Sequence, residues 1–155
     1  MTAQAGPDEA AGGVPVRASF LRAAEDWRDG VRAAARLLVD LGTADEAYVD
    51  ACVSTVEEHG PYIVLTPGVA LAHARAEPGT TTEGLAAVRL GEPVRFGHPT
   101  NDPVDVVLAF SSGGSHMEMI RAMGKALTGG LADRLREADD VTAAERALAE
   151  AVRHG

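Results

Sequence analysis

The pattern of apolar and polar residues changes its period along this chain. Residues 16–20 alternate weakly, which favours a short strand. From residue 26 onward the apolar positions recur at helical spacing and are followed by Gly42, which predicts a helix ending at that glycine. The apolar positions of this helix are Trp27, Val31, Ala34, Leu38 and Leu41.

A second helix is predicted directly after this glycine. Thr43 is a suitable N-cap, and Glu46 three residues later would complete a capping box. The pattern ends at Gly60. Cys52 lies on the apolar face of this helix, so we interpret it as a small buried hydrophobic residue rather than a reactive thiol.

The middle of the chain is rich in short apolar runs typical of strands. The runs predicted as strands are residues 62–65, 69–72, 85–90 and 104–110. The last of them is continuously apolar from residue 106, which predicts a central strand covered on both faces.

Helices are predicted again after this strand. The first would begin at Ser115, which could form a capping box with Glu118, and two more are predicted over residues 131–137 and 142–152. Helices before and after a block of strands predict an α/β fold, in which a mixed β-sheet has helices packed on it in a single domain.

The acidic composition narrows the class of partner. The 155-residue chain carries 23 acidic against 14 basic side chains, a formal net charge of −9. This balance argues against nucleic acid and anionic membranes as partners and favours a protein with a basic surface. The single cysteine excludes a disulfide framework and a multi-cysteine metal site.

The sequence also predicts where the protein resides. Residues 1–15 lack the basic and apolar regions of a secretory signal, and the uncharged residues 60–74 are too short to span a bilayer. We therefore expect a cytoplasmic protein without direct membrane insertion. Residues 1–15 are expected to form a flexible N-terminal tail, and residues 16–155 the domain.

The common motifs of nucleotide-binding proteins, zinc proteases and serine hydrolases are absent from the sequence. Candidate chemistry therefore rests on the histidines. His59 at a helix end, His98 in a loop and His154 near the last residue have ordinary surface explanations, and their spacing supports no metal site.

His73 and His116 differ from these three. His73 follows an apolar strand and stands beside the cation Arg75, while His116 lies in the first turn of a helix that follows the buried strand. Helix N-termini and strand ends are favourable places for a phosphate, and a neutral imidazole is a competent nucleophile. Two unrelated histidines at element ends would give the same spacing, and that alternative stays open at this point.

One segment resembles a known family. Residues 60–75, with the sequence GPYIVLTPGVALAHAR, resemble the active-site segment of the mannitol/fructose-type enzyme IIA domains of the sugar phosphotransferase system. The Gly-Pro-Tyr opening and the His-Ala-Arg close look most like the ascorbate-specific branch. The junction Ser-Gly-Gly-Ser before His116 matches a second, looser family feature.

The resemblance implies a mixed sheet with helices on both faces and a relay of phosphate. In this family the histidine matching His73 accepts a phosphoryl group from the phosphocarrier HPr and passes it to a cysteine of enzyme IIB, which serves a membrane permease. The resemblance implies that His116 orients the phosphoryl group, and we expect Arg75 and Ser115 to bind it. It implies no metal and no other cofactor, and a substrate such as ascorbate or a related sugar or polyol.

Family members usually carry proline directly before the active histidine, where this chain has Ala72. Since proline fixes φ, we expect the strand end to be less rigid here.

Other functions remain compatible with the sequence. A regulatory enzyme IIA-like module would use phosphorylation of His73 to control a protein partner, because the added charge changes local docking. A helix–sheet domain with purely structural histidines is the third possibility.

Overall fold

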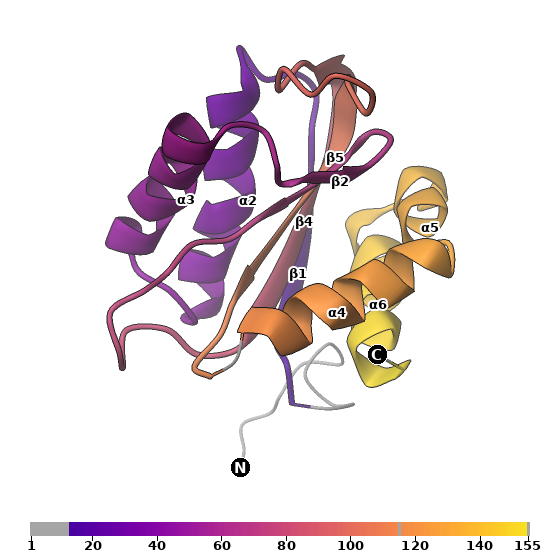
Figure 1. Cartoon of the computed structure of the whole chain (residues 1–155). Coiled ribbons are helices and arrows are strands. Elements are labelled where there is room, and N and C mark those ends of the chain that lie inside the picture. Colours follow the sequence, from indigo (N-terminus) through magenta and orange to yellow (C-terminus); the bar gives the residue numbers. More distant parts are fainter. Residues whose placement is uncertain (1–12, 115, 155) are drawn as a thin grey trace.

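A computed structural model describes residues 13–114 and 116–154 of the chain. Its five-stranded mixed sheet has the order β1-β4-β5-β3-β2 (Figure 1). The strands are β1 (Val16–Leu21), β2 (Val64–Thr66), β3 (Val69–Ala72), β4 (Gly84–Val94) and β5 (Val104–Ser111). Strand β5 lies at the centre, which confirms the prediction for the continuously apolar run. It pairs in parallel with β3 and antiparallel with β4.

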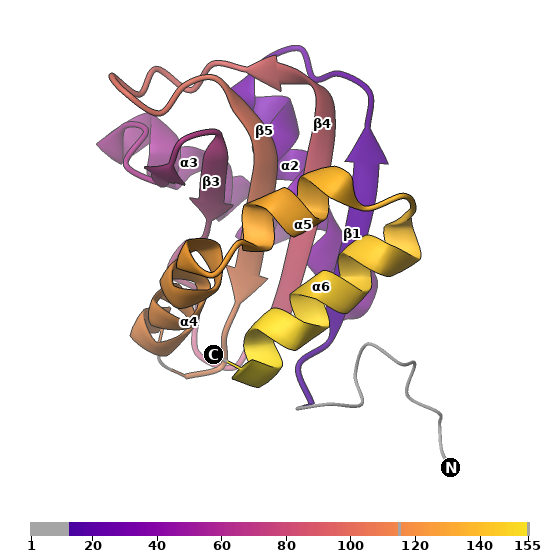
Figure 2. The ribbon, with the colours of Figure 1, turned by 90° about the vertical axis from the view of Figure 1, so that its right-hand side faces the viewer.

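Helices cover both faces of this sheet, as Figures 1 and 2 show. One face carries α2 (Trp27–Leu41) and α3 (Glu46–His59), and the other carries α4 (His116–Thr128), α5 (Leu131–Glu137) and α6 (Val141–His154). The predicted fold class, a mixed sheet flanked by helices on both faces, is therefore confirmed. Helix α2 ends where predicted, at Gly42 with φ of 82°.

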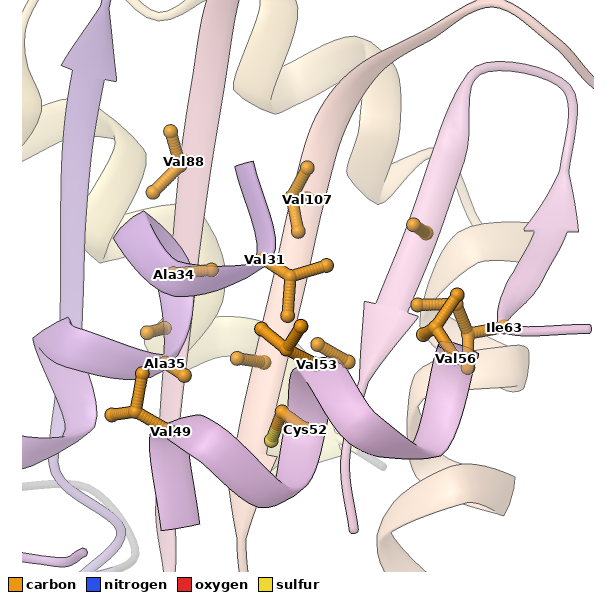
Figure 3. Packing of buried hydrophobic residues seen from close by; sticks show 14 of the residues in the cluster. Val31, Ala34, Ala35, Val49, Cys52, Val53, Val56, Ile63, Val88 and Val107 are labelled. Atoms are coloured by element: carbon orange, nitrogen blue, oxygen red, sulfur yellow. The ribbon is translucent and has the colours of Figure 1, made fainter. Parts of the chain in front are cut away.

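The hydrophobic core has two halves, one on each side of the sheet. Successive side chains of β5 point to opposite faces of the sheet and so contribute to both halves. Val107 faces α2 and α3, whereas Leu108 and Phe110 face α4, α5 and α6. Figure 3 shows the first half, in which Cys52 of α3 is fully buried among valines. The interpretation of this cysteine as a buried hydrophobic residue is confirmed.

The predicted N-cap of α3 is wrong. Asp45 caps the helix, and its carboxylate accepts a hydrogen bond from the N–H of Tyr48 at 3.0 Å. Thr43 is buried instead; its hydroxyl donates to Leu38 O at 3.2 Å and accepts from the Ser111 hydroxyl at 3.0 Å. Since these contacts use the Thr43 hydroxyl inside the protein, the capping function falls to the aspartate two residues later.

Two side chains tie the C-terminal helices to the sheet. Arg89 of β4 places its guanidinium 3.7 Å from the centroid of the Phe20 ring. Its Nη1 donates to the carbonyl oxygens at the end of α5, those of Leu135, Arg136 and Ala138, at 2.9, 3.0 and 2.9 Å. Glu145 of α6 accepts a hydrogen bond from the N–H of Ala18 on the edge strand β1 at 3.0 Å.

The expected N-terminal tail lies mostly outside the described residues, which begin at Gly13. Val14 packs against the second half of the core, and the carbonyl of Pro15 accepts a hydrogen bond from the N–H of Leu85 at 3.0 Å. Within the described ranges, no helix combines the length and the apolar composition needed to cross a membrane.

Candidate active site

The ends of two parallel strands bring the candidate histidines together. His73 follows the last residue of β3, and His116 begins α4, which follows β5. Because β3 and β5 are parallel neighbours, their carboxyl ends lie at the same edge of the sheet, where ligands bind in α/β proteins. The imidazole centroids are 6.3 Å apart.

The hydrogen bonds of His73 determine which nitrogen is free to react. Its Nδ1 lies 3.0 Å from the carbonyl oxygen of Leu71. A carbonyl can only accept, so Nδ1 carries the proton and Nε2 keeps a lone pair. Within the described part of the chain, Nε2 has no hydrogen-bond partner. The ring stacks on Phe110, with centroids 5.2 Å apart and planes inclined by 15°.

Burial also sets the charge of His73. Desolvation lowers its pKa below the ordinary value of 6.5; the bond to Leu71 O opposes this shift, and the nearby His116 reinforces it. The imidazole is therefore neutral at neutral pH, the form that a nucleophile requires.

His116 is held by a different contact. Its Nε2 lies 2.7 Å from the carbonyl oxygen of Ala74, the residue between His73 and Arg75. Nε2 is thus the donor, which leaves Nδ1 for any contact with a ligand. The bond joins the first turn of α4 to the loop that carries His73.

These side chains line an open pocket of about 620 Å³. His73, Arg75 and His116 share it with His59, Tyr62 and Met117. Tyr62 and Met117 are among the exposed large hydrophobic residues, at 48% and 58% exposure, so the lining presents apolar as well as polar side chains. Exposed apolar side chains of this kind are often found where one protein contacts another.

Arg75 is the cation placed for an anion in this pocket. Its side chain is exposed, and no carboxylate of the described residues lies within salt-bridge distance of it. Its charge is therefore available to a ligand. Ser115, the other expected phosphate-binding residue, lies outside the described residues.

Sequence reasoning missed part of this site. The sequence predicts His59 as a surface residue at a helix end, and the structure places it in the pocket lining together with His73, because α3 ends at His59 beside the pocket. Phe110 belongs to an apolar strand pattern, and nothing in that pattern marks it as the surface on which His73 stacks. Among the described residues, no three potential metal-binding side chains converge on one point.

Comparison with known proteins identifies the family. The model of the "Phosphoenolpyruvate-dependent sugar phosphotransferase system, EIIA 2" family matches residues 17–150. The chain belongs to this enzyme IIA family. The resemblance drawn from residues 60–75 is thereby confirmed.

Two of the similar proteins are named for ascorbate and for mannitol. An ascorbate-specific EIIA component of Shigella boydii is 42% identical over 89 residues, which are 57% of this chain and 58% of that protein. The match thus spans less than two thirds of the relative's length. The solution structure of the mannitol-specific cryptic enzyme IIA of Escherichia coli is 30% identical, with a TM-score of 0.69 over 88% of this chain and 92% of that one.

A further solved structure shares the fold. Enzyme IIA for mannitol of Escherichia coli, in a complex with phosphorylated enzyme IIB, is 20% identical. It superposes with a TM-score of 0.74 over 95% of this chain and 98% of that one. At this identity the likeness concerns the architecture of the sheet and helices only.

Proposed function

We propose that this enzyme IIA domain relays phosphate: His73 accepts a phosphoryl group from HPr and passes it to a cysteine of an enzyme IIB. One observation carries the proposal. The Nδ1 of His73 is bound to Leu71 O, which directs reactivity to Nε2 in a pocket that also holds His116 and the exposed Arg75.

The chemistry of the first step follows from this tautomer. The Nε2 lone pair of His73 attacks the phosphorus of phosphorylated HPr, and the donor's N–P bond breaks, with its electron pair returning to the donor imidazole. The new N–P bond leaves positive charge on the His73 ring. The Nδ1 proton stays on its nitrogen, and the carbonyl of Leu71 stabilises that charge.

Nearby groups suit the negative charge of the phosphoryl oxygens. Arg75 supplies a cation, and we assign Ser115 and the first N–H groups of α4 as further donors. His116 donates its Nε2 proton to Ala74 O and, in this tautomer, has no Nδ1 proton to give a phosphoryl oxygen, so it acts by holding the loop that carries His73. In the second step a thiolate of enzyme IIB attacks the phosphorus, and His73 leaves as the neutral imidazole.

The names of the relatives favour particular partners. The Shigella relative is called ascorbate-specific, so we assign this domain to uptake of ascorbate or a related sugar or polyol through an enzyme IIB and a membrane permease. A related fold has been solved in complex with phosphorylated enzyme IIB. The net charge of −9 favours docking of a basic surface such as that of HPr.

The first experiment measures intact-protein mass after incubation with phosphoenolpyruvate, enzyme I and HPr. The wild-type chain is expected to gain one acid-labile phosphoryl group, and His73→Ala none. His98→Ala is the matched control, because among the described residues His98 bonds within its own loop, and it lies outside the pocket; it should gain the group normally. A gain in His73→Ala, or none in the wild type beside phosphorylated HPr, would contradict the proposal.

The second experiment mixes the phosphorylated domain with purified enzyme IIB of an ascorbate-specific or a mannitol-specific system. Loss of the phosphoryl group to the ascorbate-specific protein supports the assignment. Retention in the presence of both would refute the transport assignment and leave control of a protein partner as the use of the phosphohistidine.

A further inference from the structure

Next to His73, the backbone departs from the pattern of hydrogen bonds that joins β3 to β5. The N–H of Val106 donates to Gly68 O at 3.1 Å, whereas the N–H of Leu71 points to the other side and donates to Ile63 O at 2.9 Å. Even-numbered residues of this stretch therefore direct their backbone polar groups toward β5. The register ends with Ala72 opposite Ala109.

If this register continued as far as Ala74, two further backbone hydrogen bonds would form, and neither of them is present. Ala74 would donate its N–H to Phe110 O and accept from the N–H of Ser112. Instead, the Ala74 N–H donates to the hydroxyl of Tyr48 at 3.2 Å, and that hydroxyl donates to Phe110 O at 2.7 Å. The carbonyl of Ala74 accepts from His116 Nε2 at 2.7 Å. The side chains of Tyr48 and His116 thus bind the two backbone groups of Ala74 that would otherwise pair with Phe110 and Ser112.

The Tyr48 hydroxyl is well suited to this position. The residue is 3% exposed and lies on the buried face of α3. Burial raises the pKa of Tyr48 above its ordinary value, so the hydroxyl keeps its proton and its dual function as donor and acceptor. A buried hydroxyl with both bonds satisfied holds two strands at a defined separation.

We propose that Tyr48 is a positioning residue for phosphoryl transfer: its hydroxyl, inserted between Ala74 N–H and Phe110 C=O, keeps the residues that follow β3 from pairing with β5. The separation seats the His73 ring on Phe110, with Nε2 in the pocket, and leaves the Ala74 carbonyl for His116. This inference rests on the proposed function of His73. Tyr48 acts through the backbone and does not touch the phosphoryl group.

The test compares Tyr48→Phe with Thr43→Val. Each variant loses one buried hydroxyl that links two segments, but Thr43 contacts Leu38 and Ser111 rather than Ala74, Phe110 or His116. Thr43→Val therefore matches the loss of a buried hydroxyl without disturbing the loop of His73. The rate constant of phosphorylation is measured against the concentration of phosphorylated HPr, and imidazole proton shifts are recorded by NMR.

In Tyr48→Phe the Ala74 N–H and Phe110 C=O are left to pair directly, which moves His73. The rate constant at saturating donor is expected to fall about tenfold to a hundredfold, because small displacements of a reacting group have effects of this size. The half-saturating donor concentration should change little. The ring-current shift that Phe110 imposes on His73 should weaken. Thr43→Val should change neither the rate constant at saturating donor nor this ring-current shift.

The possible outcomes separate the two proposals. If the wild type is phosphorylated and Tyr48→Phe matches Thr43→Val in rate and in His73 shifts, the positioning function is refuted while the relay stands. A wild type that accepts no phosphoryl group refutes the relay, and with it the part of Tyr48 in transfer. Hydrogen exchange on the wild type covers the case of an unfolded variant: the Ala74 amide should exchange more slowly than that of exposed Glu77, and equal rates would overturn the inference.

Discussion

Arg89 provides a quantitative test of how the C-terminal helices are attached. Arg89→Met keeps the unbranched apolar stem but removes the guanidinium from Phe20 and from three carbonyl oxygens, those of Leu135, Arg136 and Ala138. A bond from a charged donor contributes about 1.5–3 kcal/mol, and three acceptors sharing one nitrogen are equivalent to one or two such bonds. With about 0.5–1 kcal/mol for the cation–π contact, we expect a loss of about 3 kcal/mol in the free energy of unfolding.

Urea unfolding followed by circular dichroism measures this loss as a lower midpoint at an unchanged slope. Arg17→Met is the control: Arg17 is exposed on β1, and the variant should remain within about 0.5 kcal/mol of the wild type. Because Arg89 is remote from His73 along the sheet, the folded variant should still accept phosphate. A loss below about 1 kcal/mol would show that the carbonyls find other donors, and would refute the reasoning.

Three further predictions concern single groups. Because burial lowers the pKa of His73 from its ordinary value of 6.5, the phosphorylation rate constant should fall, as Nε2 gains a proton, at a lower pH than it would for a free imidazole; single-turnover rates and an NMR titration check this. Gly68→Ala should lower the free energy of unfolding in urea by about 1 kcal/mol more than Gly97→Ala. Both glycines have positive φ (79° and 93°), but only at Gly68 would an added Cβ lie 2.6 Å from Arg136 Nη2. Equal losses in the two variants would contradict this reasoning. Burial raises the pKa of the Cys52 thiol to about 12, so a thiol reagent at mildly alkaline pH should react only after urea unfolding, and rapid reaction of the native protein would contradict the buried position.

Local signals account for the elements that the sequence predicted well. The helix before Gly42 combines helical apolar spacing with a residue that readily adopts positive φ, and both signals lie within the segment itself. Residues 106–110 of strand β5 are continuously apolar, which fits a strand with both faces covered. Strand β4 extends to Val94, beyond the predicted end at Leu90, because the exposed residues Gly91, Glu92 and Pro93 break the apolar pattern before the pairing of Val94 with Val104.

Features that depend on distant partners could not be predicted. Thr43 and Asp45 are both good N-caps, and the choice is made by the hydroxyl of Ser111, far along the chain. The same holds in the site. His73 and His116 stand out as imidazoles at element ends, but Tyr48 follows the apolar pattern of α3, and its hydroxyl meets Phe110 only in the folded protein.

The bond between Glu145 and Ala18 has a consequence for how this molecule meets others. Since Leu85 donates to Pro15 O, odd-numbered residues of β1 face β4, and the N–H of Ala18 points away from the sheet. An open strand edge of this kind can recruit a strand from another chain, which is a route to aggregation. The carboxylate of Glu145 occupies the middle of that edge, so an incoming strand would have to displace a charged group before it could pair.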